Sequence, residues 1–197
     1  MRLLPICLLL LVVGASTAVS APIKLIYEGI GSGSIGEPFA YTYFTDISFT
    51  LTATADTNNR TFSSRFGYEI PHDGATIELQ GLGKFDLTSD STTRFGGTIV
   101  SLENTESPLF GLFNIESPVF ANWDVLDSIG PIESDGTIDD WYIRPFFTTG
   151  GELNLYNGVG PARFTAIVAP EPASVLIFLL MTSVLLLSPR RARPTLP

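Results

Sequence analysis

The densest group of side chains that could bind a ligand in this chain is acidic. Asp135, Asp139 and Asp140 lie close together around Gly136, and Glu133 precedes them. Carboxylate oxygens on a loop are ligands that Ca²⁺ prefers in proteins. The spacing differs from that of an EF-hand, which places ligands at alternating positions and ends on a bidentate glutamate. We therefore favour a solvated acidic loop, with a calcium site at the three aspartates as the alternative and no other metal or cofactor expected.

Two tryptophans near acidic residues indicate a second kind of binding chemistry. Trp123 precedes Asp124, and Trp141 lies between Asp140 and Tyr142. Aromatic faces stack on the apolar faces of pyranose rings, while carboxylates hold sugar hydroxyls. Trp123 and Trp141 are therefore candidate glycan contacts. Burial in a hydrophobic core is the competing interpretation, and we favour it because large aromatic side chains are mostly buried.

Residue combinations typical of enzymes are scarce. His72 is the only histidine, and the residues that follow it favour a turn over 72–74. A single histidine excludes a multi-histidine zinc site, and no G-x-S-x-G motif supplies a nucleophilic serine. The acidic residues are too numerous for one pair of hydrolase carboxylates to be chosen from them. We predict no catalytic residue, and a secreted glycan hydrolase is the least favoured alternative.

A glycine-rich stretch matches the dinucleotide-binding pattern G-x-G-x-x-G. It runs from Gly31 to Gly36 and follows a predicted strand. In dinucleotide-binding folds a helix begins at this point and presents its backbone amides to the pyrophosphate. Here Glu37-Pro38-Phe39 continues into extended, aromatic sequence. We therefore predict a glycine-rich hairpin loop without a nucleotide.

The elements that must position these residues are short strands. Residues 47–54 alternate apolar and hydroxyl side chains, which is the period of a half-buried strand. No segment of 21–169 shows a sustained helical period. Further strands are predicted over 23–28, 76–79, 84–87, 98–102, 141–147, 153–156 and 163–168, with turns that include 72–74 and 134–136. The pattern predicts an all-β domain, an antiparallel β-sandwich or jelly-roll, and a barrel stays open because strand order is not visible.

Composition narrows the class of partner. Residues 21–169 are enough for a single domain with its own core. This domain carries a net charge of about −12 and no cluster of lysine or arginine. Nucleic acid is therefore excluded as a partner, because a negative field repels the phosphate backbone. The only cysteine, Cys7, precedes the domain, which consequently forms no disulfide.

The first 20 residues have the pattern of a secretory signal peptide. A charged start is followed by an apolar run over residues 3–13 and then by small residues. Ala18 and Ser20 fit the −3 and −1 positions for cleavage before Ala21, and cleavage after Ala18 is the alternative. The export translocon and signal peptidase are the expected partners of this end.

Three features meet at the other end, over residues 170–193. A Pro-Glu-Pro motif precedes an uncharged segment, 173–188, and an arginine cluster, 190–193. A helix over that segment would rise about 24 Å, less than the ~30 Å hydrocarbon core, so we expect a transient anchor with its arginines on the cytoplasmic side. The motif residues are Pro170, Glu171 and Pro172, and the membrane-flanking residues are Arg190, Arg191 and Arg193.

This combination of motif, apolar segment and terminal arginines resembles the PEP-CTERM sorting signal of Gram-negative and related environmental bacteria. The resemblance implies recognition by an exosortase, a membrane-embedded protease-transpeptidase with a cysteine nucleophile. It also implies association with exopolysaccharide or a biofilm matrix, and it assigns no activity to the upstream domain. We expect an exported, non-enzymatic surface or matrix protein that passes through an inner-membrane intermediate. A carbohydrate- or calcium-binding module is the alternative.

Overall fold

The computed structural model describes residues 21–64, 67–105, 113–138, 145–156 and 158–169, and the structural statements below concern these residues. They belong to one compact unit, Ala21–Ala169, whose bounds are those expected for the ectodomain. Several predicted features lie outside the described residues: Ala18, Ser20, Asp139, Asp140, Trp141, the motif at 170–172, the apolar segment at 173–188 and the arginines at 190–193.

Strands make up most of the described chain. In chain order they are β1 (Pro22–Gly36), β2 (Thr42–Asp56), β3 (Thr61–Ser63), β4 (Gly67–Leu79), β5 (Gly83–Asp86), β6 (Ser91–Gly96), β7 (Ile99–Asn104), β8 (Phe113–Glu116), β9 (Ile129–Ile138), β10 (Phe146–Thr148), β11 (Gly151–Tyr156) and β12 (Gly158–Val168). Short 3₁₀ segments occur at η1 (Thr57–Asn59) and η2 (Pro118–Asn122). Within the described part of the chain, no helix has the length and apolar character that crossing a membrane requires.

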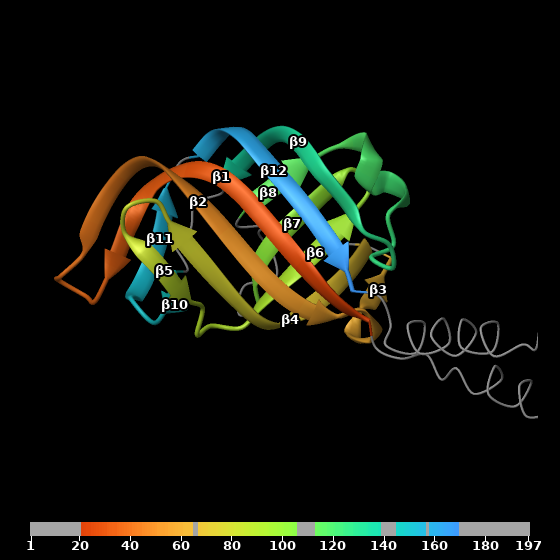
Figure 1. Ribbon diagram of the computed structural model, residues 1–197, viewed down its shortest axis with the longest axis horizontal. Coiled ribbons are helices and arrows are strands. Elements are labelled where there is room, and N and C mark those ends of the chain that lie inside the picture. Colours follow the sequence, from red (N-terminus) through yellow and green to blue (C-terminus); the bar gives the residue numbers. More distant parts are fainter. Residues whose placement is uncertain (1–20, 65–66, 106–112, 139–144, 157, 170–197) are drawn as a thin grey trace, which may run out of the picture. The chain divides into compact units, whose positions relative to one another are not determined.

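Eight strands close into an antiparallel barrel in the order β1, β2, β4, β6, β7, β8, β9 and β12 (Figure 1). β12 pairs back with β1, so that Ile23 lies opposite Val168 on one side and Ala55 on the other. The all-β, antiparallel prediction is confirmed, whereas the preferred sandwich or jelly-roll is wrong and the barrel alternative is right. Alternation shows only that one face of each strand is buried, which a sandwich and a barrel both satisfy.

Three further strands form a smaller ring with parts of β1, β2 and β4. These parts are the C-terminal ends of β1 and β4 and the N-terminal half of β2. β11 pairs with β1, β10 pairs with β11, and β5 pairs with β4. The chain after β5 meets β10 at a bridge between Leu87 and Thr148, where the amide of Thr88 donates to the carbonyl of Phe147 at 2.8 Å. Figure 1 shows β5, β10 and β11 beside the protruding β1–β2 hairpin. The barrel and the smaller ring therefore share three strands.

The stretch from Gly31 to Gly36 lies inside β1, so the predicted hairpin loop is wrong. β1 pairs with β12 up to Glu28 and with β11 beyond it, and its register against β2 shifts between Gly31 and Gly33. A Cβ at Gly33 would lie 2.1 Å from the backbone oxygen of Asn154 in β11. Glycine is needed here because two backbones approach closely.

Aromatic and aliphatic side chains fill the barrel. Tyr27 and Phe164 are fully buried, and their ring centroids lie 5.0 Å apart in an edge-to-face arrangement. Trp123 is 8% exposed, and its ring centroid lies 5.5 Å from that of Phe164. The Trp123 indole nitrogen donates to the carbonyl of Asp127 at 2.8 Å. Trp123 therefore belongs to the core, and its face is not open to a sugar.

β9 contains residues for which the sequence predicted a turn and an acidic loop. Asp135 is exposed near the middle of this strand. Gly136 is buried, and a Cβ there would lie 2.4 Å from the Cβ of Ala162 and 3.1 Å from the ring of Phe113. The predicted turn at 134–136 is wrong, because this glycine makes room for neighbouring core side chains instead of reversing the chain.

Candidate functional site

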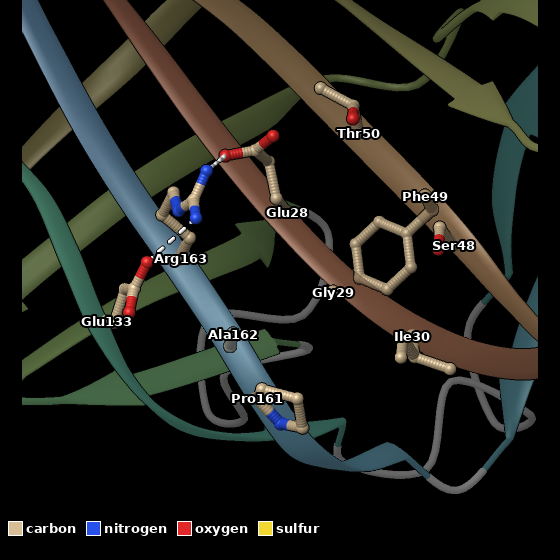
Figure 2. Close-up of a pocket in the computed structure, with 10 residues that line it drawn as sticks. All are labelled: Glu28, Gly29, Ile30, Ser48, Phe49, Thr50, Glu133, Pro161, Ala162 and Arg163. Atoms are coloured by element: carbon tan, nitrogen blue, oxygen red, sulfur yellow. Dashed lines mark hydrogen bonds and ion pairs between the residues drawn. The ribbon is translucent and has the colours of Figure 1, made fainter.

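A surface pocket opens in the barrel wall where β1 changes its partner strand. The β1–β12 pairing ends at Glu28 opposite Arg163, and the β1–β11 pairing begins at Ser32 opposite Tyr156. Residues 29–31 have no partner strand on that edge in either pairing. We call the resulting hollow the wall pocket, and it is lined by Glu28, Gly29, Ile30, Ser48, Phe49, Thr50, Glu133, Pro161, Ala162 and Arg163 (Figure 2).

Charged side chains form one rim of the wall pocket. In Figure 2 the guanidinium of Arg163 lies between two carboxylates. Its Nη1 is 3.7 Å from Oε2 of Glu28, and its Nη2 donates to Oε1 of Glu133 at 2.7 Å. The hydrogen bond with Glu133 is the main reason that the pKa of Arg163 is raised. All three side chains are substantially exposed, so these ion pairs orient the rim and contribute little to stability.

The rest of the wall pocket is apolar or bears hydroxyl groups. A Cβ at Gly29 would lie 3.0 Å from the Phe49 ring, so the glycine lets that ring pack closely against the backbone of β1. The cavity measures about 310 Å³, which is at the lower end of the range for small-ligand pockets. Carboxylate oxygens accept hydrogen bonds and the guanidinium donates them. The side chains of the wall pocket are therefore suited to binding a small ligand that is rich in hydroxyl groups.

A network of hydrogen-bonded side chains surrounds His72, which is half-buried, and reaches buried residues of the barrel. The Nε2 atom of His72 lies 2.8 Å from Oγ1 of Thr93, and its Nδ1 atom lies 2.8 Å from Oγ of Ser91. Oγ1 of Thr93 also lies 2.7 Å from the buried hydroxyl of Tyr27. His72 is part of β4, so the predicted turn at 72–74 is wrong. Because hydroxyls occupy both ring nitrogens, the ring lacks the carboxylate contact that orients a triad histidine.

A buried ion pair that the sequence does not predict joins β6 and β7. Nη1 of Arg94 lies 2.9 Å from Oε2 of Glu103, and their side chains are 11% and 4% exposed. Nη2 of Arg94 lies 3.3 Å from Oε2 of Glu69 on β4. Burial raises the pKa of Glu103 to about 7, although Arg94 opposes the shift. No sequence signal joins these residues, because their proximity depends on which strands are neighbours.

Protonation of His72 should link the stability of the fold to pH. Burial lowers the pKa of His72 from 6.5 to about 4, so the unfolded chain takes up a proton that the folded chain does not. The contribution of this group is complete above pH 6.5 and is lost as the pH falls towards 4. Between about pH 7.5 and about pH 4.5 it should lower the free energy of unfolding by about 2–3 kcal/mol.

His72→Gln is the matched variant for this measurement, because an amide forms hydrogen bonds without titrating. Denaturant titrations of both proteins at the two pH values isolate the histidine. Glu103, whose raised pKa lowers stability as the pH rises, is present in both and cancels in the comparison. The variant should show the smaller loss at acid pH. Parallel pH profiles would mean that His72 accepts a proton without cost in the folded state.

The structure brings together few of the predicted ligand residues. Asp135 is exposed on β9, while Asp139 and Asp140 lie beyond the described end of that strand. Among the described residues, no group of three histidine, cysteine, aspartate or glutamate side chains is placed to hold a metal ion. Calcium binding stays a prediction from the sequence alone.

The wall pocket and the buried network are two sites of different character. The first is open to solvent and has the residue types of a binding surface. The second is largely buried, and its hydrogen bonds join side chains of the barrel to each other. No protein-family model, curated protein or solved structure matches the chain.

Proposed function

We propose that this chain is an exported, non-enzymatic surface or extracellular-matrix protein that is sorted through Pro170-Glu171-Pro172 and associates with exopolysaccharide. The signal-peptide pattern over residues 1–20 and the combined tail pattern over 170–193 support export and sorting. An exosortase-like membrane protease is the proposed processing partner. The membrane holds the chain only until the tail is processed.

The observation that carries this proposal is the placement of the two ends of the barrel. Ile23 of β1 lies opposite Val168 of β12, and the amide of Ala169 donates to the carbonyl of Pro22 at 2.9 Å. Figure 1 shows the start of β1 beside the end of β12. In the sequence, the proposed signal-peptide cleavage point lies just before β1, and the proposed sorting motif lies just after β12. Cleavage at either point would therefore leave every strand of the barrel in place.

A closed barrel is also suited to display outside the cell. Closure means that none of its eight strands is an edge strand, and edge strands promote pairing with other chains. The domain has no cysteine, so its folding does not depend on the redox state of the compartment. These two properties favour a domain that stays folded and separate after export.

A second candidate function, a carbohydrate-binding module, is supported by the wall pocket. Its carboxylates, guanidinium and hydroxyl groups match the hydrogen-bonding groups of a sugar, and its volume suits a small ligand. This candidate is compatible with the first, because a matrix protein can act by binding the matrix polymer. The calcium-binding and hydrolase alternatives have no comparable support among the described residues.

Replacing Glu171 with alanine should block processing of the tail. The prolines on both sides of Glu171 keep the peptide extended, as a protease requires, and they remain in the variant. The proposed recognition of the motif therefore depends on the Glu171 carboxylate, which the variant lacks. We expect the variant to accumulate as a precursor in the membrane fraction. The wild-type protein should be recovered at the surface or in the medium with a lower intact mass, measured by mass spectrometry.

Glu37→Ala is the matched control for the tail variant. Glu37 is an exposed glutamate at the turn between β1 and β2, and its loss should leave processing unchanged. A Glu171→Ala product with the mass and the location of the wild-type protein would refute sorting through this motif.

A further inference from the structure

The outer face of the ribbon formed by β2, β1 and β11 carries three tyrosines. Ser34 of β1 lies opposite Tyr43 of β2 and Asn154 of β11, and Ser32 lies opposite Tyr156 of β11. Residues directly opposite each other in an antiparallel pair project from the same side of the sheet. We call this surface the tyrosine face, and it comprises Ser32, Ser34, Tyr41, Tyr43, Glu152, Asn154 and Tyr156.

Hydrogen bonds hold two of the three rings in place. The hydroxyl of Tyr41 donates to Oε2 of Glu152 at 2.5 Å, which raises the pKa of Tyr41 to about 12. The hydroxyl of Tyr156 lies 2.7 Å from Oγ of Ser34, a side chain that is itself buried. The ring centroids of Tyr41 and Tyr43 are 6.5 Å apart. Rings already fixed in position lose little conformational entropy when a ligand binds.

The aromatic surface at this end of the molecule is open to solvent. Tyr43 is 72% exposed, and Phe39, at the turn between β1 and β2, is fully exposed. Phe39 also has a φ angle of 74°, a region that bulky residues rarely adopt. An exposed aromatic residue in a strained conformation adds nothing to the core. It therefore points to a contact outside the domain.

The polar groups around the tyrosines select among partners. Asp46 accepts a hydrogen bond from Ser32, and Glu152 holds Tyr41. The tyrosine face includes no lysine or arginine, so it does not attract an anionic polymer or anionic lipid. The carboxylate of Glu152 in this face and that of Asp46 beside it also make insertion into a bilayer costly. Aromatic rings beside hydroxyl, amide and carboxylate groups match an uncharged sugar, whose apolar face stacks and whose hydroxyls donate.

We propose that the tyrosine face binds an uncharged polysaccharide, with Tyr43 stacking on a sugar ring and Glu152 accepting hydrogen bonds from its hydroxyls. The face continues along β1 to the wall pocket. Ile30, in that pocket, and Ser34, which lies opposite the exposed Tyr43, are separated by roughly 13 Å along the strand. One extended polymer can therefore contact both the pocket and Tyr43. This inference rests on the proposed function in one respect, which is that export brings the protein to the polymer. It adds that the polymer is uncharged.

Affinity gel electrophoresis of the protein purified from its host tests this proposal. The gels contain dextran, mannan or hydroxyethyl cellulose, which are soluble uncharged polysaccharides, or alginate, which is anionic. We expect at least one uncharged polymer to retard the wild-type protein and alginate not to do so. Tyr43→Ala should weaken that binding about tenfold, and Tyr43→Phe should preserve it because the ring face remains.

Phe62→Ala is the matched control for Tyr43→Ala. Phe62 is 66% exposed but lies on β3, away from the β1–β2–β11 ribbon, so its loss should leave the retardation unchanged. Absence of retardation by all three uncharged polymers would overturn the proposal, as would equal losses in the two alanine variants. Binding to phosphatidylcholine vesicles that Phe39→Ala abolishes would assign the surface to a membrane instead. Tail processing is measured by intact mass, so the two proposals can fail separately.

Discussion

Replacing Phe164 with alanine is expected to lower the free energy of unfolding by about 3–5 kcal/mol. Phe164 is fully buried, and its ring lies 5.0 Å from that of Tyr27, 5.6 Å from Phe120 and 5.5 Å from Trp123. Truncation would remove these edge-to-face contacts and leave a cavity that three large rings cannot easily fill. The measurement is a denaturant titration of the wild-type and variant proteins.

Phe62→Ala provides the control for this prediction. The Phe62 side chain is 66% exposed, although its ring lies 5.0 Å from that of Tyr68. Its truncation should cost about 1 kcal/mol or less, because little apolar surface returns to water. A loss for Phe164→Ala no larger than that for Phe62→Ala would show that the aromatic cluster does not hold the barrel together.

The strand that carries Phe164 could be predicted from the sequence. Apolar and polar residues alternate over 163–166, and β12 contains the whole predicted segment 163–168 with Phe164 and Ala166 buried. The same alternation identified 47–54 within β2. Where a strand directs apolar side chains to the core and polar ones to solvent, the two-residue period is sufficient to predict the strand. It does not reveal which strands are neighbours, so the barrel could not be chosen over a sandwich.

The polar residues of β6 explain why this strand is not predicted from the sequence. Its residues Ser91 and Thr93 are buried, and they hydrogen-bond to His72 inside the barrel. Polar side chains on the buried face remove the alternation that a strand prediction relies on. The partner that satisfies them is far away in the sequence. The buried network could therefore be found only from the fold.

Two glycines are predicted wrongly for a related reason. The sequence predicts a hairpin loop at Gly33 and a turn at Gly136, because glycine most often marks a change in chain direction. Both lie inside strands, at positions where a side chain would collide with a neighbour. The wall pocket was equally hidden, since it exists only because β1 exchanges β12 for β11 between Glu28 and Ser32. Neither the close contacts at the two glycines nor the change of partner strand leaves a local pattern in the sequence.

Gly33→Ala is expected to lower the free energy of unfolding by about 3 kcal/mol. The added Cβ would lie 2.1 Å from the backbone oxygen of Asn154 and 2.9 Å from the ring of Phe44. The ring can move, but the backbone oxygen belongs to the β1–β11 ladder, in which Ser34 pairs with Asn154. Relief of the clash must therefore separate the two strands that form most of the tyrosine face.

Gly160→Ala is the matched control, because Gly160 also lies in a strand and nothing is within 4 Å of the Cβ that it would gain. Denaturant titrations should place Gly160→Ala within about 0.5 kcal/mol of the wild-type protein. If the tyrosine face binds polysaccharide as proposed, Gly33→Ala should also lose retardation in the affinity gel while Gly160→Ala keeps it. Equal stabilities for the two variants would mean that β1 and β11 do not approach as closely as their register requires.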